Sequence, residues 1–298
     1  MSEQRDHHDD HDHRDNRDHR EHREQREQRE HREQREQREQ REQREQPERL
    51  STTTGEFDLQ EYRLHVAGRE WSILHTGALV GWVDEQIFLG EFRDLLPYGV
   101  ALWPSAIALA HDIGGRGADV SGKTVLELGA GTGLPGIVAA SLGARLTQTD
   151  KHPVAMHVCK RNGERNRVDT IQYRSADWAA WDDSAQYDWI IGADILYADD
   201  MHEHLLRIFE RNLAPGGRVL ISDPFRYRSI HMLEVLEAQG WKLAMTKWAI
   251  EHRKDTRRVG VFELIPPRGG MQLRSDPSHP RRRADSTPGA SPPSTGEE

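Results

Sequence analysis

The hydrophobic positions in the middle of the chain alternate between short apolar runs, typical of buried strands, and stretches with one apolar side, typical of surface helices. Leu102, Ala106 and Leu109 fall at i, i+4 and i+7 and predict a helix. Its first turn contains Pro104, where the missing N–H does no harm. The next run, KTVLEL, predicts a buried strand, and LPGIVAASLG predicts a helix closed by Gly143.

The same alternation continues toward the C-terminus and predicts a doubly wound α/β domain. Further strands are predicted at RLTQTD, TIQYRSADW, YDWIIGADILY and GGRVLISDP, with helices from Pro153 to about Asn166, from about Met201 to Leu213 and over RSIHMLEVLEAQG. Strands that alternate with helices pair in parallel through crossover connections. The last two strands, WKLAMTKWAIE and RRVGVFELI, are joined only by HRKDT, so we expect an antiparallel last strand on a mostly parallel sheet.

A shorter pattern precedes this domain. Residues alternate in polarity around Leu64 and again around Trp71, and the AGRE between the two runs suits a hairpin turn. We therefore expect residues 48–101 to form a small N-terminal extension, with a β-hairpin and a helix, ahead of a domain over residues 102–266.

The two ends of the chain do not have the composition of a folded domain. Residues 1–47 contain no large apolar residue except Met1 and run from a His- and Asp-rich stretch into an REQ repeat. Residues 267–298 are rich in Pro, Ser, Gly and charge. Neither segment can bury enough apolar surface to offset chain entropy, so both are predicted to be disordered or, at most, to form an isolated helix. HHDDHDH contains ligand types for a transition metal, but without a defined geometry we predict no metal site.

The overall composition narrows the class of protein. The formal net charge of -9 over 298 residues argues against binding nucleic acid through general electrostatics. The one cysteine, Cys159, excludes a disulfide within the chain and favours a reducing compartment. No apolar run approaches the roughly 18 residues of a membrane span, and the N-terminus lacks a signal-peptide apolar region, so we expect a soluble cytoplasmic protein.

The strongest chemical motif is ELGAGTGLPG, residues 127–136, between a predicted strand and a predicted helix. A loop in this place presents backbone N–H groups and the positive end of a helix dipole to a ligand. Its glycines are spaced G-x-G-x-G, and Leu134 stands where the dinucleotide fingerprint G-x-G-x-x-G has its third glycine. Nor does this loop have the G-x-x-x-x-G-K-[ST] spacing of a phosphate-gripping loop.

Two carboxylates near this loop indicate the cofactor class. Glu127 precedes the loop by two residues, where a carboxylate suits a cationic ligand better than a pyrophosphate. Asp150 ends the second predicted strand, where an acidic side chain can bind both ribose hydroxyls. The combination favours an adenosine ligand that carries positive charge, namely S-adenosyl-L-methionine.

Several motifs taken together identify a family resemblance. VLELGAGTGLPGI, TQTD, ADW and DWIIGADILY resemble the class I, seven-strand S-adenosylmethionine-dependent methyltransferases. LWPSAIALA and DILY resemble the protein-lysine methyltransferase branch of that family. The resemblance covers about residues 102–265 and implies a Rossmann-like sheet of seven strands.

The resemblance implies how the cofactor would be bound. Gly129 and Gly131 would let the backbone approach the methionine moiety, and Glu127 would support its amino group. Asp150 would bind the ribose.

The remaining implied roles lie farther along the chain. Asp177 would accept a hydrogen bond from the adenine amino group, with Trp178 against the adenine ring. Trp103 would line the methionine end. Asp194 and Tyr197 would border the reacting methyl group and the target nitrogen.

Each of these residues also has a structural explanation. Asp150 and Asp177 can cap a helix and a turn, and Asp194 can begin a helix. Trp103 and Trp178 can serve packing alone. The loop glycines can satisfy positive φ without touching a ligand.

The motifs favour a protein lysine as the methyl acceptor. Methyl transfer from a sulfonium needs a positioned nucleophile more than acid–base help. A lysine amine must first lose its proton, since its free pKa is about 10.4. A carboxylate alone would stabilise the charged amine, so we expect Asp194 to orient the amine and not simply to deprotonate it. GADILY is not the Asn/Asp-Pro-Pro-aromatic signature of amide or adenine methylation. Cys159 is predicted on a helix away from the site, which argues against a thiolate that attacks cytosine.

We therefore predict transfer of a methyl group from S-adenosyl-L-methionine to a protein lysine, with a protein substrate as partner. A small-molecule N- or O-methyltransferase is one alternative, because the fold alone does not set the function. A cofactor-binding interaction protein without activity is another, although its intact motif residues weigh against it. The target protein, the number of methyl groups and the oligomeric state do not follow from the sequence.

Overall fold

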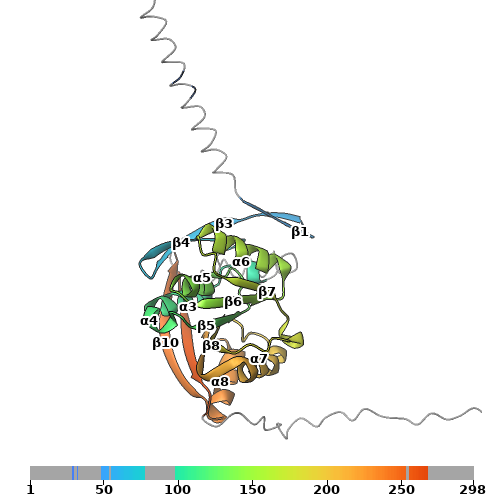
Figure 1. Cartoon of the computed structure of the whole chain (residues 1–298), viewed down its shortest axis with the longest axis vertical. Helices are drawn as coiled ribbons and strands as arrows, with labels where there is room; N and C mark the ends of the chain where they lie inside the picture. The colour runs from blue at the N-terminus through green and yellow to red at the C-terminus, as the bar shows by residue number, and fades with distance from the viewer. Residues whose placement is uncertain are drawn as a thin grey trace, which may run out of the picture.

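Seven strands form one sheet with the spatial order β10-β11-β9-β8-β5-β6-β7 (Figure 1). A computed structural model describes residues 29, 32, 48–53, 55–77, 98–252 and 255–267. The strands of this sheet are β5 (Thr124–Leu128), β6 (Arg145–Asp150), β7 (Gln172–Ser175), β8 (Tyr187–Ala193), β9 (Leu213–Asp223), β10 (Lys242–His252) and β11 (Asp255–Ile265). The predicted tails, residues 1–47 and 267–298, lie almost entirely outside the described residues.

The pairing of these strands confirms the predicted doubly wound topology. β5 pairs in parallel with β6 and β8, β6 pairs with β7, and β8 pairs with β9. β11 runs antiparallel to both β9 and β10, as predicted from the short connection between the last two strands. The chain order reverses at β5, which has β6 on one side and β8 on the other. Open α/β sheets bind ligands beyond the carboxyl ends of the strands at such a point.

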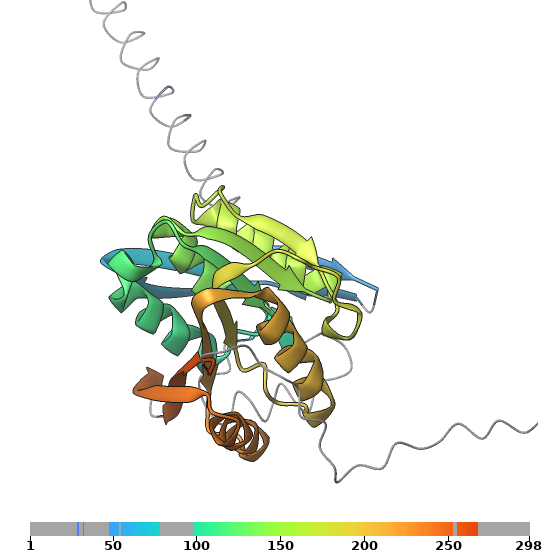
Figure 2. The ribbon, with the colours of Figure 1, turned by 60° about the horizontal axis from the view of Figure 1, so that its bottom comes forward.

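Helices cover both faces of the sheet (Figures 1 and 2). They are α3 (Pro104–Gly115), α4 (Gly117–Val120), α5 (Leu134–Ser141), α6 (Pro153–Arg165), α7 (Asp199–Asn212) and α8 (Tyr227–Ala238). Successive residues of a strand point to opposite faces of the sheet. Val125 accordingly packs in the hydrophobic cluster with α3 and α5, whereas its neighbour Leu126 packs in the cluster with α7 and α8.

The N-terminal extension, in its described residues, consists of two hairpins and a 3-10 turn. Its elements are β1 (Arg49–Thr52), β2 (Gly55–Asp58), β3 (Gln60–Val66), β4 (Arg69–His75) and η2 (Tyr98–Val100). Ala67 and Gly68 connect β3 to β4 with φ of 53° and 73°, as a two-residue hairpin turn requires. The predicted AGRE turn is thus confirmed, whereas the β1–β2 hairpin was not predicted. β4 packs against α6 and β3 against α3.

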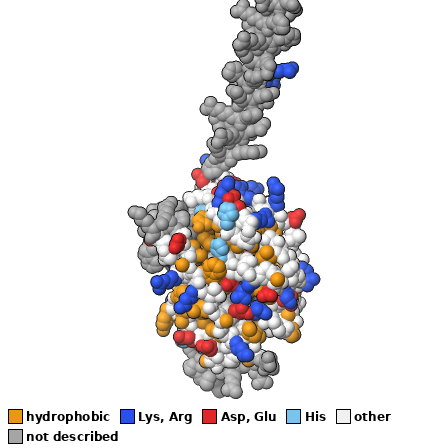
Figure 3. All heavy atoms as spheres, turned by 90° about the vertical axis from the view of Figure 1, so that its left-hand side faces the viewer, with side chains coloured by type: hydrophobic (Ala, Val, Ile, Leu, Met, Phe, Trp, Pro, Cys, Tyr) orange, Lys and Arg blue, Asp and Glu red, His pale blue; other side chains and the backbone are white. Residues whose placement is uncertain are grey.

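The helices, the side-chain clusters and the surface charges of the described residues bear on whether the chain meets a membrane, a metal ion or a macromolecule. Among the described residues, no helix combines the length and the apolar character that a membrane crossing requires. The same part of the chain contains no cluster of three or more His, Cys, Asp or Glu side chains that could bind a metal ion. On the face drawn in Figure 3, Lys and Arg are interspersed with Asp and Glu, with hydrophobic side chains between them.

Candidate active site

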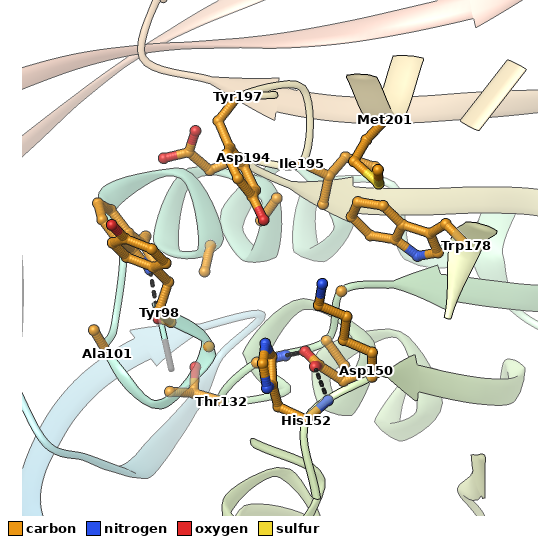
Figure 4. A pocket seen from close by; sticks show the side chains of 18 of the residues that line it. Tyr98, Ala101, Thr132, Asp150, His152, Trp178, Asp194, Ile195, Tyr197 and Met201 are labelled. Carbon is orange, nitrogen blue, oxygen red and sulfur yellow. Dashed lines mark hydrogen bonds between the residues drawn. The ribbon is translucent and has the colours of Figure 1, made fainter. Parts of the chain in front are cut away.

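A cavity of about 330 Å³ lies at the carboxyl edge of the sheet, where the chain order reverses (Figure 4). Its lining includes one residue from the end of each of five strands: Gly129 after β5, Asp150 at the end of β6, Asp177 after β7, Asp194 after β8 and Arg226 after β9. Because parallel strands end at the same edge, residues far apart in the sequence meet there.

The glycine loop after β5 needs glycine for both backbone shape and space. Gly129 and Gly131 have φ of 62° and 56°, a region that other residues seldom adopt. A Cβ on Gly129 would lie 3.1 Å from Ile195 and 3.2 Å from Trp178. A Cβ on Gly131 would lie 2.9 Å from the carbonyl oxygen of Gly99. Both glycines line the cavity, so its wall here is bare backbone.

Asp150 joins the glycine loop to the next strand–helix turn. Its Oδ2 accepts the N–H of Gly131 at 3.1 Å, and its Oδ1 accepts the N–H of His152 at 2.9 Å. Burial raises the pKa of this carboxyl group, against the lowering effect of these hydrogen bonds. His152, not Asp150, is the N-cap residue of α6. The structure therefore brings Asp150 into the cavity wall with part of its acceptor capacity directed at the backbone.

Asp177 and Trp178 follow β7 at the side of the cavity. The strand ends at Ser175, earlier than the predicted TIQYRSADW, and η3 (Trp178–Ala180) begins after Asp177. Asp177 Oδ1 accepts the N–H of Ala179 at 3.0 Å, so the turn-capping explanation applies. Trp178 also packs partly against the hydrophobic cluster of α7 and α8. Both residues nevertheless line the cavity, so the structural and the binding explanations are compatible.

Glu127 does not line the cavity, in contrast to the other predicted cofactor residues. Its side chain is buried beneath α5, where Oε1 accepts the N–H of Gly136 at 3.2 Å and Oε2 accepts from Gln148 at 2.5 Å. Burial raises the pKa of Glu127 to about 8, although these hydrogen bonds lower it. The physical reason is strand alternation: Leu126 and Leu128 face α7 and α8, so Glu127 faces the opposite helices. Glu127 thus supports the loop from behind.

Trp103 stands at the start of α3 and lines the cavity. Its Nε1 donates to the carbonyl oxygen of Tyr98 at 3.0 Å, which fixes the indole to η2. The guanidinium of Arg226 lies 5.7 Å from the centre of the Trp103 ring. Trp103 is therefore both a packing residue and part of the wall.

Asp194 and Tyr197 lie in the loop after β8, across the cavity from Asp150 and His152 (Figure 4). Asp194 is buried, and both of its carboxylate oxygens accept from Arg226, each at 2.8 Å. Tyr197 is 47% exposed at the mouth. Partial burial and the nearby charges of Asp150 and Asp194 raise the pKa of the Tyr197 hydroxyl, which keeps its proton.

Several residues that line the cavity were not predicted from the sequence. Tyr98 and Gly99 belong to η2, whose position against the glycine loop no local pattern indicates. Arg226 lies three residues beyond the end of β9. The position of Arg226 after a predicted parallel strand was the available signal, because every such strand end reaches this edge.

Another glycine stretch resembles a phosphate-binding motif in sequence alone. GADVSGKT, residues 117–124, has the G-x-x-x-x-G-K-T spacing. In the structure it is α4, a turn and the first residue of β5, so the chain runs from helix to strand. A phosphate-gripping loop runs from strand to helix. The stretch also precedes β5 and therefore lies at the opposite edge of the sheet from the cavity.

The cavity residues fit the predicted cofactor. The volume falls within the range of small-molecule sites. The backbone at Gly129 and Gly131 leaves room that any Cβ would fill. The Asp150 carboxylate can accept hydrogen bonds from ribose hydroxyls, and an indole ring at Trp178 can stack on a purine. These features are what S-adenosyl-L-methionine requires of a protein.

Comparison with known proteins identifies relatives of the chain. A family model described as lysine methyltransferase matches residues 93–234. Protein N-lysine methyltransferase METTL21A of Xenopus tropicalis is 34% identical over 168 residues, covering 54% of this chain and 78% of that protein. Histone-arginine methyltransferase METTL23 of Rattus norvegicus is 31% identical over 138 residues, covering 44% of this chain and 61% of that protein. Among solved structures, a precorrin-6y C5,15-methyltransferase from Geobacter metallireducens aligns with a TM-score of 0.45 at 15% identity, covering 54% of this chain and 87% of that chain.

Proposed function

The chain belongs to the lysine methyltransferase family, its methyl donor is S-adenosyl-L-methionine, and we propose that it methylates the side-chain amine of a lysine in a protein substrate. One observation carries the proposal beyond the family: Asp194 and Tyr197 face the glycine loop and Asp150 across one cavity. A donor cradle and a polar acceptor wall therefore share the same small space.

The donor half of the cavity comprises the residues after β5, β6 and β7. In this proposal the backbone of Gly129 and Gly131 contacts the methionine moiety, and Asp150 accepts from the ribose hydroxyls. Asp177 accepts from the adenine amino group, with Trp178 against the ring. Glu127 contributes indirectly, because its hydrogen bond to the N–H of Gly136 fixes the start of α5 behind the loop.

The acceptor half comprises the residues after β8 and β9, with η2. Trp103 at the start of α3 borders both halves, because it would also line the methionine end of the donor. When bound, S-adenosyl-L-methionine supplies a methyl group on a sulfonium that a neutral amine can accept. The carboxylate of Asp194 and the hydroxyl oxygen of Tyr197 accept the N–H groups of that amine, which leaves its lone pair directed at the donor half. The rings of Tyr98 and Trp103, 6.2 Å apart, exclude water from this wall.

The experiment is methyl transfer to a heat-treated cell lysate with radiolabelled S-adenosylmethionine, followed by protein hydrolysis and separation of methylated amino acids. The proposal expects label in methyl-lysine with the wild-type chain and none with Asp150→Ala. Label in methyl-arginine, or only in small molecules, would overturn the lysine assignment. No label with a chain that still binds the cofactor would favour the interaction protein without activity.

We also propose that the protein acts in the cytoplasm. Its single cysteine is buried and free, as a reducing compartment allows. Cell fractionation of the full chain tests this location, and recovery in a membrane or secreted fraction would contradict it.

A further inference from the structure

Arg226 and Asp194 form a two-pronged ion pair in the wall of the acceptor half. Arg226 Nε donates to Asp194 Oδ1 and Nη2 donates to Oδ2, both at 2.8 Å. Paired hydrogen bonds of this kind fix the orientation of both groups and are stronger than neutral ones. Asp194 is 8% exposed, so water screens this pair less than it would a surface pair.

Both partners are held in place by the fold. Asp194 has φ of 54°, and its N–H donates to the carbonyl oxygen of Ser222 at 2.7 Å. The N–H of Arg226 donates to Asp223 Oδ1 at 2.7 Å, and Ser229 donates to Asp223 Oδ2 at 2.5 Å. The positive φ of Asp194 is a strained backbone conformation for a residue other than glycine. Such strain persists where the surrounding structure fixes it, and it is common at functional sites. The ion pair is therefore part of the architecture of the wall.

An isolated carboxylate in this place would oppose the proposed reaction. Only the neutral amine has a lone pair to offer, yet a carboxylate within about 4–6 Å raises the pKa of an amine by about 1–3 units. The guanidinium that covers both oxygens of Asp194 cancels most of that effect. The carboxylate keeps lone pairs that can accept an N–H from the amine.

We propose that Arg226 is a positioning residue that neutralises the charge of Asp194, so that the wall binds the lysine as a neutral amine. This inference rests on the proposed lysine methylation. It assigns to Arg226 an effect on the acceptor alone, because Arg226 comes from the β9 end of the cavity and not from the donor half.

Other charges surround the pair and must stay constant in a test. Asp223 lies behind it on β9, and Asp150 faces it from β6. On α7, Asp199 is paired with Arg228 at 3.5 Å, and Asp200 follows it. Lys151 and His152 also line the cavity, on the side of Asp150, and Tyr98 and Tyr197 stand at the mouth.

The test compares Arg226→Gln, Arg226→Lys and Asp194→Asn/Arg226→Gln with the wild type. Labelled methyl-lysine is measured in single turnovers, with heat-treated lysate protein as acceptor and enzyme raised until the rate no longer increases. Rates are then followed from about pH 6.5 to about pH 10, so that the midpoint reports the bound amine. Binding of S-adenosylhomocysteine by calorimetry serves as the control for an intact donor half.

Removing the positive charge raises the pKa of the bound amine, because the ammonium form is then less repelled. We expect the midpoint for Arg226→Gln to rise by about one unit and the rate near pH 7.5 to fall about tenfold, with recovery at high pH. The midpoint for Arg226→Lys stays closer to the wild-type midpoint. The midpoint of the double variant returns toward the wild-type value, but its rate at high pH levels off at a lower maximum. Cofactor affinity stays within about threefold throughout.

A rate loss for Arg226→Gln that is equal at every pH, or an unchanged midpoint, would overturn the inference and leave Arg226 a structural role only. A wild-type chain that labels no lysine would instead refute the proposed function, and this inference would fall with it. The wild-type measurement therefore separates the two failures.

Discussion

Asn162 binds the backbone of Leu74 on both sides: its Oδ1 accepts the Leu74 N–H at 2.7 Å, and its Nδ2 donates to the Leu74 carbonyl oxygen at 3.0 Å. The same Nδ2 donates to the carbonyl oxygen of Thr132 at 2.9 Å. Thr132 belongs to the glycine loop and lines the cavity. One buried side chain on α6 thus connects the N-terminal hairpin to the proposed donor half of the cavity.

Asn162→Leu should therefore weaken both the fold and the donor half. The change leaves the buried N–H and carbonyl groups of Leu74 without partners, at a cost of about 2 kcal/mol or more in the free energy of unfolding. We expect the Kd for S-adenosylhomocysteine to rise about tenfold, because Thr132 also loses its donor.

A matched control for this prediction is Asn166→Leu. Asn166 binds the backbone of Ser72 in the same two-sided way, but its Nδ2 also donates to the carbonyl oxygen of Asn162 on α6 and not to the glycine loop. We expect a comparable loss in thermal unfolding with an unchanged Kd in calorimetry. Equal effects of the two variants on cofactor affinity would contradict a specific connection through Thr132.

Gly131→Ala should weaken cofactor binding. A Cβ there would lie 2.9 Å from the carbonyl oxygen of Gly99, and φ of 56° is unfavourable for alanine by about 1–2 kcal/mol. Gly143→Ala is the comparison, since Gly143 has φ of 95° but lies at the far end of α5. Both variants should lose thermal stability, whereas only Gly131→Ala should raise the Kd, by about tenfold or more. An unaffected Kd would show that the loop does not contact the ligand.

Glu127→Gln should change how stability depends on pH. The pKa of Glu127 is about 8 in the folded protein against 4.5 for an ordinary glutamate, so its contribution to stability is fully present below pH 4.5 and is lost as pH rises toward 8. We expect the Tm of the variant to gain several degrees on the wild type between about pH 5 and about pH 8. The exposed Glu234→Gln serves as the control. A constant difference across this range would mean that the folded protein keeps Glu127 ionised.

Tyr197→Phe should slow methyl transfer without weakening cofactor binding. The hydroxyl is one of two proposed acceptors for the amine N–H groups, and its loss should lower the turnover rate about tenfold. Tyr227→Phe is the control, because Tyr227 is 87% exposed and does not line the cavity. A parallel loss of S-adenosylhomocysteine affinity would place Tyr197 in the donor half instead.

Much of the fold follows from hydrophobic periodicity, because long strands and helices repeat their pattern. The order of the seven sheet strands and of the helices α3, α5, α6, α7 and α8 was predicted correctly, as was the final hairpin, whereas the short α4 and η3 were not predicted. The β1–β2 hairpin was not predicted either, since each strand has four residues and only Leu50 on them is buried. Short, exposed strands leave no apolar alternation to detect.

Site residues can be predicted from the sequence where their position along a strand determines whether they reach the cavity. Asp150 and Asp194 reach the cavity because they stand at the carboxyl ends of parallel strands. The motif alone suggests that Glu127 contacts the ligand, but strand alternation directs its side chain under α5 and away from the cavity. The pairing of Asp194 with Arg226 depends on side-chain directions in two loops, and sequence spacing does not encode those directions.

The division of the cavity has a consequence for how such enzymes change targets. Apart from Trp103, the residues proposed to contact the donor stand at the ends of β5, β6 and β7, whereas those proposed to meet the acceptor follow β8 and β9. The two sets lie on opposite sides of the point where chain order reverses. Substitutions in one half can therefore accumulate while the other is conserved. Substitutions around the acceptor can therefore direct the enzyme to a new protein surface while every intermediate sequence still binds S-adenosyl-L-methionine.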